Sequence, residues 1–334
     1  MTDRSASVAD RGGAAATTSI GGLQLNNPIL TASGTFGYGE EMARFFNVAA
    51  LGGVVTKTVT LRPRAGNPTP RIAETPAGML NSIGLQNVGV EAFVRDKLPY
   101  LAALDTVVVV SIMAATAAEF GELAGELRME GVDALELNLS CPNATYGDDG
   151  RESAAAAGSG GRHVMFAHSA ELTEAAVAAA RAATDRPLIA KLGPDVPDIV
   201  ALGAAAQRGG ADALCVMNTM PGMVIDTAAR RPALARAIGG LSGPAVRPIG
   251  VRLVYQLAAA QPLPVVGVGG ISSTEDALQY LMAGARAVQV GSASFVRPTA
   301  AHEVLLGLHE YLRREETTVE ELIGAAHRTG ESSE

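Results

Sequence analysis

The sequence predicts a single-domain α/β fold, a (β/α)8 TIM barrel whose active-site loops follow the C-terminal ends of the strands. Two observations support this prediction. Eight short runs rich in β-branched residues alternate with Ala-rich amphipathic segments, many of which end in Gly. In addition, 48% of the 334 residues are hydrophobic but only 4% are aromatic, so Ala, Val, Leu and Ile must form most of the core, as in buried parallel strands.

The strand candidates are spread over the whole chain. They cover residues 27–33, 52–60, 106–113, 134–140, 187–193, 213–219, 264–271 and 287–294. Helix candidates fall between them, and the clearest lie at 117–131, 171–184, 198–210 and 273–285. A doubly wound open sheet shares this alternation and is the alternative, but eight strand–helix units in a row favour the barrel.

The two ends of the chain differ from its centre in composition. Residues 1–18 are small and polar, and we expect a disordered tail there. Residues 19–315 form the predicted barrel, which is within the usual size of one such domain. Residues 316–334 are predicted to add a short helix and a polar C-terminal tail.

Charge and cysteine content exclude several classes of protein. A formal net charge of −8 argues against a nucleic-acid partner. The N-terminus has no apolar signal-peptide core, and the most apolar stretch, TVVVVSIMAATAA, is too short to span a bilayer. Two cysteines provide no disulfide framework. We therefore expect a cytoplasmic protein without membrane contact, and no His, Cys and carboxylate cluster indicates a metal site.

Polar residues gather where the predicted strands end. In a barrel these ends share one face, which is where the chemistry of this fold lies. Such a concentration is hard to explain by packing in an otherwise apolar chain. The residues are Ser33, Lys57, Ser111, Asn138 with Cys141, Lys191, Asn218 with Thr219, Gly269 with Gly270, and Gly291 with Ser292.

Cys141 is the most unusual of these residues. In LELNLSCPNATYG it follows a strand-like run and directly precedes a proline, so it lies in a loop and not in a core position. A thiol has an ordinary pKa of about 8.5, and its thiolate can accept a proton. By contrast, Cys215 lies inside the sixth strand candidate and is expected to be buried and inert.

Three glycine-rich segments indicate a phosphate site. GVGGISSTEDA follows the seventh strand, GSASF follows the eighth, and GGLSGPAVRP precedes a helix. Glycines let an anion approach backbone N–H groups near a helix N-terminus, and barrels often bind phosphate after these two strands. GVGGIS lacks the final glycine and the acidic residue of a dinucleotide fingerprint, which argues against NAD binding by this chain.

Taken together, these motifs resemble the dihydroorotate dehydrogenases, and more narrowly the FMN-containing catalytic subunit of the class 1B, NAD-linked enzymes. The resemblance runs from about residue 20 to about residue 323. Its most specific pieces are NPTPRIAETPAGMLNSIGLQN, NLSCPN, VMNTMPGM and GGLSGPAVRPI. It implies oxidation of (S)-dihydroorotate to orotate in pyrimidine biosynthesis, with FMN as the cofactor.

The resemblance also implies roles for individual residues. Cys141 is the base that takes the C5 proton while hydride passes from C6 to flavin N5, and Lys57 lies between flavin and substrate as the second catalytic residue. Further predicted FMN contacts are Ser33, Thr58, Asn138, Lys191, Met217, Gly243, Gly269, Gly270, Gly291 and Ser292. Predicted substrate contacts besides Lys57 are Asn81, Ser82, Ile83, Gly84, Leu85, Asn138, Asn143, Asn218 and Thr219.

Asparagine suits the substrate because an amide both donates and accepts, as a ring of alternating C=O and N–H groups requires. Asn67, at the start of NPTPR, is interpreted as a turn residue and not as a ligand. Two features depart from the family pattern. Ser111 stands where an Asn is common, which leaves its contact with the flavin open. The segment after CPN is longer than usual, so whether the catalytic loop closes as in the family is undecided from the sequence.

The resemblance places the electron relay on another chain. A partner subunit is expected to hold FAD and a 2Fe–2S cluster, because such a cluster needs four cysteines and this chain has two. The implied assembly is a heterotetramer, a homodimer of this chain with two electron-transfer subunits. The alternatives are a class 1A fumarate-linked homodimer, a dihydropyrimidine or tRNA dihydrouridine flavoenzyme, a sugar-phosphate lyase or isomerase without flavin, and a non-catalytic flavin-binding partner.

Overall fold

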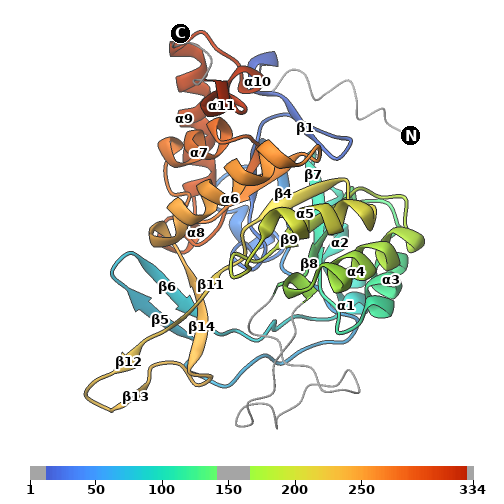
Figure 1. Ribbon diagram of the computed structural model, residues 1–334, viewed down its shortest axis with the longest axis vertical. Helices are drawn as coiled ribbons and strands as arrows, with labels where there is room; N and C mark the ends of the chain where they lie inside the picture. Colours follow the sequence, from blue (N-terminus) through green and yellow to red (C-terminus); the bar gives the residue numbers. More distant parts are fainter. Residues whose placement is uncertain (1–12, 141–165, 329–334) are drawn as a thin grey trace.

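The computed structural model describes residues 13–140 and 166–328, and its centre is a closed barrel of eight parallel strands (Figure 1). Each of the eight predicted runs overlaps one of these strands, so the predicted (β/α)8 barrel is confirmed. In chain order the barrel strands are β3 (Ile29–Thr31), β4 (Gly53–Val55), β7 (Val107–Ile112), β8 (Ala134–Asn138), β9 (Leu188–Leu192), β10 (Ala213–Val216), β15 (Val265–Val268) and β16 (Ala285–Val290).

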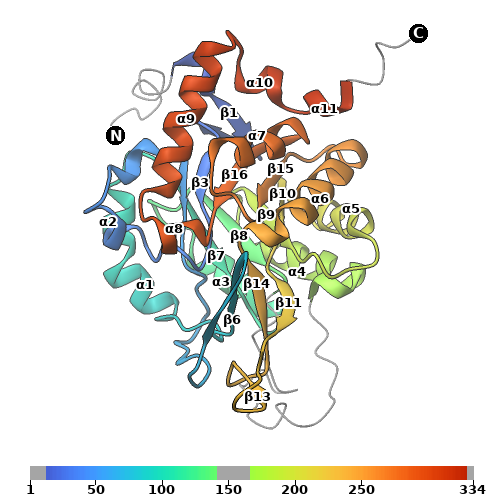
Figure 2. The same cartoon turned by 90° about the vertical axis from the view of Figure 1, so that its left-hand side faces the viewer.

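Helices connect the strands and surround the barrel (Figures 1 and 2). Their bounds agree with the four clearest helix predictions to within a few residues, apart from the last turn of the segment predicted at 117–131. The larger helices are α1 (Val90–Asp96), α3 (Ala117–Glu126), α4 (Ala170–Ala183), α5 (Ile199–Arg208), α6 (Arg247–Ala260), α7 (Thr274–Met282) and α9 (Ala300–Arg314), and the shorter ones are α2 (Leu98–Ala102), α8 (Ala293–Val296), α10 (Val319–Leu322) and α11 (Ala325–Arg328).

The first connection of the barrel differs from the prediction of eight strand–helix units. Between β3 and β4 the chain forms only the 3-10 turns η4 (Glu40–Met42) and η5 (Val48–Ala50). Gly37 and Gly39 have φ values of 62° and 89°, which interrupt a helix, and the Phe36 side chain between these turns and β3 is buried in the core. The prediction of an α-helix in this unit is wrong because glycine and aromatic packing replace helical periodicity here.

A small antiparallel sheet, absent from the sequence-based prediction, stands on the C-terminal end of the barrel. It has the order β11-β14-β6-β5 and is assembled from two separate connections of the barrel. In Figure 1 it projects from the end opposite β1. Its strands are β5 (Ile72–Thr75), β6 (Gly78–Asn81), β11 (Met220–Met223) and β14 (Ile238–Ser242), and the short pair β12 (Ile225–Asp226) and β13 (Arg231–Pro232) extends it.

A hairpin closes the opposite end of the barrel. Strands β1 (Thr18–Ile20) and β2 (Leu23–Leu25) pair antiparallel around Gly21 and Gly22, and Ile20 and Leu25 are buried against the inward-facing side chains of the barrel strands. The described chain begins inside the segment expected as a tail, with a 3-10 turn at Ala14–Ala16 whose Ala16 is buried. The N-terminal end of the barrel is therefore plugged by apolar side chains.

The chain after the last barrel strand packs along one side of the molecule. Helix α9 buries Val304, Leu305, Leu308 and Leu312 on one face, and α10 and α11 follow within the segment 316–334. Thr318 and Glu321 form a capping box at the start of α10. Within residues 13–140 and 166–328 we find no helix with the length and apolar character needed to cross a membrane.

The burial of the β1–β2 hairpin in the barrel end leads to a prediction about stability. Leu25→Ala should lower the free energy of unfolding by about 2–5 kcal/mol, because it leaves a cavity at the closed end of the barrel. Gln24→Ala, on the exposed face of the same strand, is the matched control and should change stability by less than about 0.5 kcal/mol. Urea denaturation followed by circular dichroism measures both, and equal losses would show that the plug is not part of the core.

Candidate active site

The predicted site residues meet in one cavity between the barrel mouth and the antiparallel sheet. Its volume is about 360 Å³, within the range of small-molecule sites. A narrower extension of about 70 Å³ shares six lining residues with it and runs toward the ends of β15 and β16. Predicted residues that line the main cavity are Ser33, Lys57, Thr58, Asn81, Ile83, Gly84, Leu85, Asn138, Lys191, Asn218 and Thr219, and the extension adds Met217, Gly269, Gly270, Gly291 and Ser292.

Two predicted residues lie at the margin of this arrangement. Gly243 lines an outer hollow of about 690 Å³ that also contains Gly270 and Ser292. Ser82 is 1% exposed, and its hydroxyl accepts a hydrogen bond from the Asn67 side chain, so it faces away from the cavity. Cys141 and Asn143 lie outside the described residues.

A chain of hydroxyl groups forms part of the cavity floor. The Thr58 hydroxyl lies 2.9 Å from that of Ser33 and 3.0 Å from that of Ser111. Ser111 is fully buried and does not line the cavity, so it contributes by holding Thr58. Ser33, Thr58 and Ser111 follow or end three successive barrel strands, which explains how residues distant in sequence come together.

Two asparagines orient each other beside this floor. The side-chain amide of Asn218 donates to Asn138 Oδ1 and to the Ser140 carbonyl, both at 3.1 Å. Its own oxygen accepts from the Thr219 backbone N–H at 2.8 Å. These bonds fix Asn218 while Asn138 keeps its NH2 group directed toward Thr58 at 3.5 Å, a long contact that leaves donor capacity for a ligand.

The segment from Asn81 to Asn87 forms one wall, and two asparagines hold it. Asn67 is 5% exposed and donates to the carbonyl and hydroxyl oxygens of Ser82, both at 3.1 Å. Its interpretation as a simple turn residue is therefore wrong, because it braces the wall from behind. Gly84 fits against it without room for a Cβ, which would lie 2.6 Å from the Asn67 backbone nitrogen.

Asn87, which the sequence reasoning missed, anchors the other end of this wall. Its side-chain oxygen accepts from the backbone N–H groups of Thr60 at 3.2 Å and Gly89 at 2.9 Å. Its NH2 group donates to the Leu85 carbonyl at 2.8 Å and to the Thr60 hydroxyl at 2.9 Å. The available signal was the last letter of the motif NSIGLQN.

Glycine backbone shapes the narrow extension. Gly270 has a φ of 69°, and a Cβ there would lie 2.7 Å from the Gly243 carbonyl oxygen and 2.9 Å from Arg247 Cβ. The hydroxyl of Tyr280 donates to the Gly269 carbonyl at 2.7 Å, and burial raises the pKa of this phenol, so it remains a neutral donor. Only glycine at position 270 allows these chain segments to approach so closely.

The first turn of α7 contributes less to an anion site than the sequence suggested. The backbone N–H groups of Ser272 and Ser273 donate to the Asp276 carboxylate at 2.9 Å and 3.0 Å, which completes a capping box. These donors are used by the protein itself. A phosphate group would instead meet the glycine backbone at Gly269 and Gly270 and the turn at Gly291 and Ser292.

Two lysines bring positive charge to the cavity. Lys57 is half-buried and its backbone N–H donates to the Gly37 carbonyl at 2.9 Å. Lys191 is 5% exposed, and its ammonium group lies 3.2 Å from the Glu136 carboxylate inside the barrel. The sequence reasoning missed Glu136 and its second partner Gln289; the signal was a pair of long polar side chains at inward positions of two apolar strands.

The cysteine that lies within the described residues is Cys215, which the sequence predicts to be inert. Cys215 is completely buried inside the barrel, as expected. Burial raises the pKa of its thiol well above the ordinary value, and the nearby Glu136 charge acts in the same direction. At neutral pH Cys215 is therefore protonated and unreactive.

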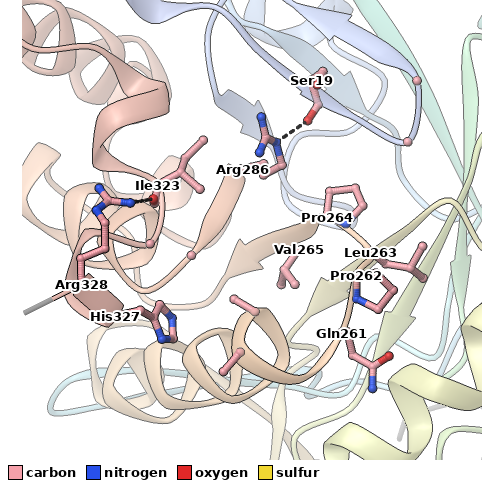
Figure 3. Close-up of a pocket in the computed structure, with 16 residues that line it drawn as sticks. Ser19, Gln261, Pro262, Leu263, Pro264, Val265, Arg286, Ile323, His327 and Arg328 are labelled. Carbon is pink, nitrogen blue, oxygen red and sulfur yellow. Dashed lines mark hydrogen bonds between the residues drawn. The ribbon is translucent and has the colours of Figure 1, made fainter. Parts of the chain in front are cut away.

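A second large hollow, of about 740 Å³, lies at the opposite end of the barrel (Figure 3). Its two arginines already bond to backbone carbonyls, Arg286 to Ser19 at 3.1 Å and Arg328 to Ile323 at 3.0 Å. None of the described site residues lines it. Within residues 13–140 and 166–328 there is also no group of three or more His, Cys, Asp or Glu suited to a metal ion.

Comparison with known proteins shows the family of the chain that forms this cavity. The family model described as dihydroorotate dehydrogenase matches residues 15–312. The chain belongs to the dihydroorotate dehydrogenase family. This confirms the resemblance, and it makes the chain an oxidoreductase of that family.

Individual dihydroorotate dehydrogenases support the narrower assignment. The chain is 51% identical, over 93% of its length and 97% of the relative's, to the "Dihydroorotate dehydrogenase B (NAD(+)), catalytic subunit" of Desulforudis audaxviator (strain MP104C). It is 48% identical, over 92% and 96%, to the protein of the same name from Trichlorobacter lovleyi (strain ATCC BAA-1151 / DSM 17278 / SZ). The predicted class 1B resemblance is therefore confirmed at the level of named relatives.

A solved dihydroorotate dehydrogenase shares the fold. The structure of the Eimeria tenella enzyme in complex with ferulenol aligns with a TM-score of 0.74, over 96% of this chain and 90% of that one. At 22% sequence identity this likeness concerns the barrel architecture alone.

The glycine turn at Gly269 and Gly270, the glycine cradle of this site, leads to a prediction about cofactor binding. Gly270→Ala should weaken FMN binding at least about tenfold, because the new methyl group would clash with backbone and the φ of 69° disfavours alanine. Gly22→Ala is the matched control: its φ of 86° is similarly left-handed, but it lies in the hairpin and has no atom within 4 Å of the added Cβ. Fluorescence titration of the apoproteins with FMN measures both. Equal affinities would exclude Gly270 from the cofactor site.

Proposed function

We propose that this chain oxidises (S)-dihydroorotate to orotate in pyrimidine biosynthesis, as the FMN-containing catalytic subunit of a NAD-linked enzyme. The observation that carries the proposal is a single cavity lined by two lysines, three asparagines and a glycine cradle, in a chain about half identical to catalytic subunits of that name. The asparagine side-chain amides both donate and accept hydrogen bonds, which matches the alternating C=O and N–H groups of a dihydropyrimidine ring.

Family membership implies FMN, and the residues present fit it. The main cavity and its extension form one elongated space whose inner end is walled by Met217, Val246 and Val268 and whose turns have no room for a Cβ at Gly270. When bound, FMN would supply the hydride acceptor for this oxidation. Residues that would hold it are Ser33, Lys57, Thr58, Asn138, Lys191, Met217, Gly243, Gly269, Gly270, Gly291 and Ser292.

The substrate would occupy the outer part of the cavity, next to Lys57. Asn81 belongs to the antiparallel sheet, where its side chain donates to the Gly240 carbonyl at 3.3 Å, and it faces the barrel-borne Asn138 and Asn218 across the cavity. Such a set can donate to the ring carbonyls and accept from the ring N–H groups. The substrate contacts in this proposal are Lys57, Asn81, Ile83, Gly84, Leu85, Asn138, Asn143, Asn218 and Thr219, while Ser82 supports the wall from behind and does not touch the substrate.

Cys141 is the proposed base. It follows the end of β8 by three positions, and Ser140 before it is buried against the Asn218 amide. In the thiolate form Cys141 would take the proton from C5 of the substrate, and the electron pair left at C5 would form the C5–C6 double bond as hydride leaves C6. The positive charge of Lys57 in the same cavity stabilises the negative charge that develops during this step.

The two electrons are proposed to leave through a partner subunit to NAD+. The sequence has two cysteines, too few for an iron–sulfur cluster, so FAD and a 2Fe–2S cluster are assigned to the partner. The names of the relatives, catalytic subunits of a NAD(+) enzyme, support a separate partner. We propose a heterotetramer, two copies of this chain with two electron-transfer subunits, located in the cytoplasm.

The first test is the visible spectrum of the purified chain during anaerobic addition of dihydroorotate. The flavin absorbance should bleach with dihydroorotate and persist with dihydrouracil, because the amides and Lys57 are matched to a carboxylated ring. NAD+ should then restore the colour rapidly only when the electron-transfer subunit is added. Full-rate reduction of NAD+ by the chain alone would contradict the proposed need for a partner subunit. Bleaching by dihydrouracil would contradict the proposed substrate specificity.

The second test concerns the base. Cys141→Ala should lower the rate of flavin reduction by dihydroorotate about 10²-fold or more while FMN stays bound. Cys215→Ala removes the other cysteine, which is buried and protonated, and should retain most of the rate. Stopped-flow absorbance measures both variants. An unchanged rate in Cys141→Ala would remove this residue from the role of base.

A further inference from the structure

A buried polar layer lies directly beneath the candidate site. Glu136, on β8, is 0% exposed and points into the barrel. One carboxylate oxygen lies 3.2 Å from the Lys191 ammonium group on β9, and the other accepts from the Gln289 side-chain amide on β16 at 2.6 Å. Strand β16 is four places from β8 in either direction around the eight-stranded barrel, so these bonds cross its full width.

Stability alone does not account for this carboxylate. The other inward-facing side chains of the barrel include Val109, Ile189 and Val266, and an apolar residue in place of a buried ion pair is often equally stable. An unpaired buried charge, in contrast, is strongly unfavourable. The arrangement therefore has a cost that a purely structural layer could avoid.

Lys191 connects this layer to the cavity. Its side chain is 5% exposed, yet it lines both the main cavity and the narrow extension. Asn138 and Cys215 are its register partners on β8 and β10. The titratable groups that face it among the described residues are Glu136, Cys215 and Lys57; the Cys215 thiol is neutral, so Glu136 supplies the compensating negative charge.

We propose that Glu136 is a positioning residue that keeps Lys191 protonated and directed at the cofactor, with Gln289 holding the carboxylate from the opposite wall. This inference rests on the proposed binding of FMN in the cavity. A buried lysine without an anionic partner loses its proton readily. With Glu136 in place, the floor of the cavity keeps a fixed positive charge that favours reduced FMN, which is negatively charged, over the oxidised form.

The test is the midpoint potential of bound FMN from pH 6 to pH 8.5 in the full-length chain. Glu136→Gln has nearly the same shape but no charge, so the pKa of Lys191 should fall and its charge should be lost as pH rises. At pH 8.5 the preference for reduced over oxidised FMN should drop about tenfold or more, which for two electrons is a decrease of about 30 mV. Toward pH 6 Lys191 regains its proton, so the decrease should disappear, and the missing negative charge of Glu136 should leave the potential at or slightly above that of the wild type.

Two further variants separate charge from packing. Cys215→Ala alters the same buried layer without removing a charge and should keep the wild-type potential at every pH. Glu136→Asp keeps the charge at a greater distance from Lys191 and should give a smaller shift in the same direction; it also serves if Glu136→Gln does not fold.

The outcomes are distinguishable. Wild-type protein that cannot bind FMN would overturn the proposed function and this inference with it. Wild-type protein that binds FMN, with a Glu136→Gln potential that is unchanged at pH 8.5, higher at pH 8.5, or shifted equally at all pH values, would overturn the inference alone. A shift of the same size in Cys215→Ala would also overturn it, because packing would then explain the effect.

Discussion

The closed ring of eight parallel strands is the constraint on which the rest of the structure depends. Closure pairs each barrel strand on both sides and leaves no free edge. It also divides the side chains of each strand into two sets. Those that point outward meet the Ala-rich helices, and those that point inward share a confined interior whose contents must fit together along the barrel axis.

This interior changes character from one end to the other. At the N-terminal end the hairpin residues Ile20 and Leu25 fill it with apolar side chains. In the middle, Glu136 and Gln289 form a polar layer, and at the C-terminal end Lys191 and Asn138 reach the cavity. Because the apolar end excludes water, charges placed above it act in a medium of low polarity, where electrostatic effects are larger than in solution.

The antiparallel sheet completes the site that the barrel begins. Strands β6 and β14 come from connections that are far apart in sequence, yet they pair through Asn81 and Gly240. Thr219 occupies the space that a side chain at Gly240 would need, where a Cβ would lie 2.0 Å from its hydroxyl oxygen. The barrel thus supplies the charged floor, and the sheet and the braced wall from Asn81 to Asn87 supply an outer boundary suited to a small polar ring.

The sequence by itself determined the barrel, since the alternation of β-branched runs and Ala-rich segments is a local property that reads directly from residue type. It also determined most of the site, because the polar residues at strand ends, such as Lys57, Asn138 and Asn218, must share one face once the strands are parallel. Tertiary structure alone decided the roles of Glu136, Asn67 and Asn87. These roles depend on partners that come from other strands or loops. No local sequence pattern shows which side chains a closed barrel brings together. The same reason applies to the antiparallel sheet, whose short glycine-containing strands become strands only when two distant connections meet.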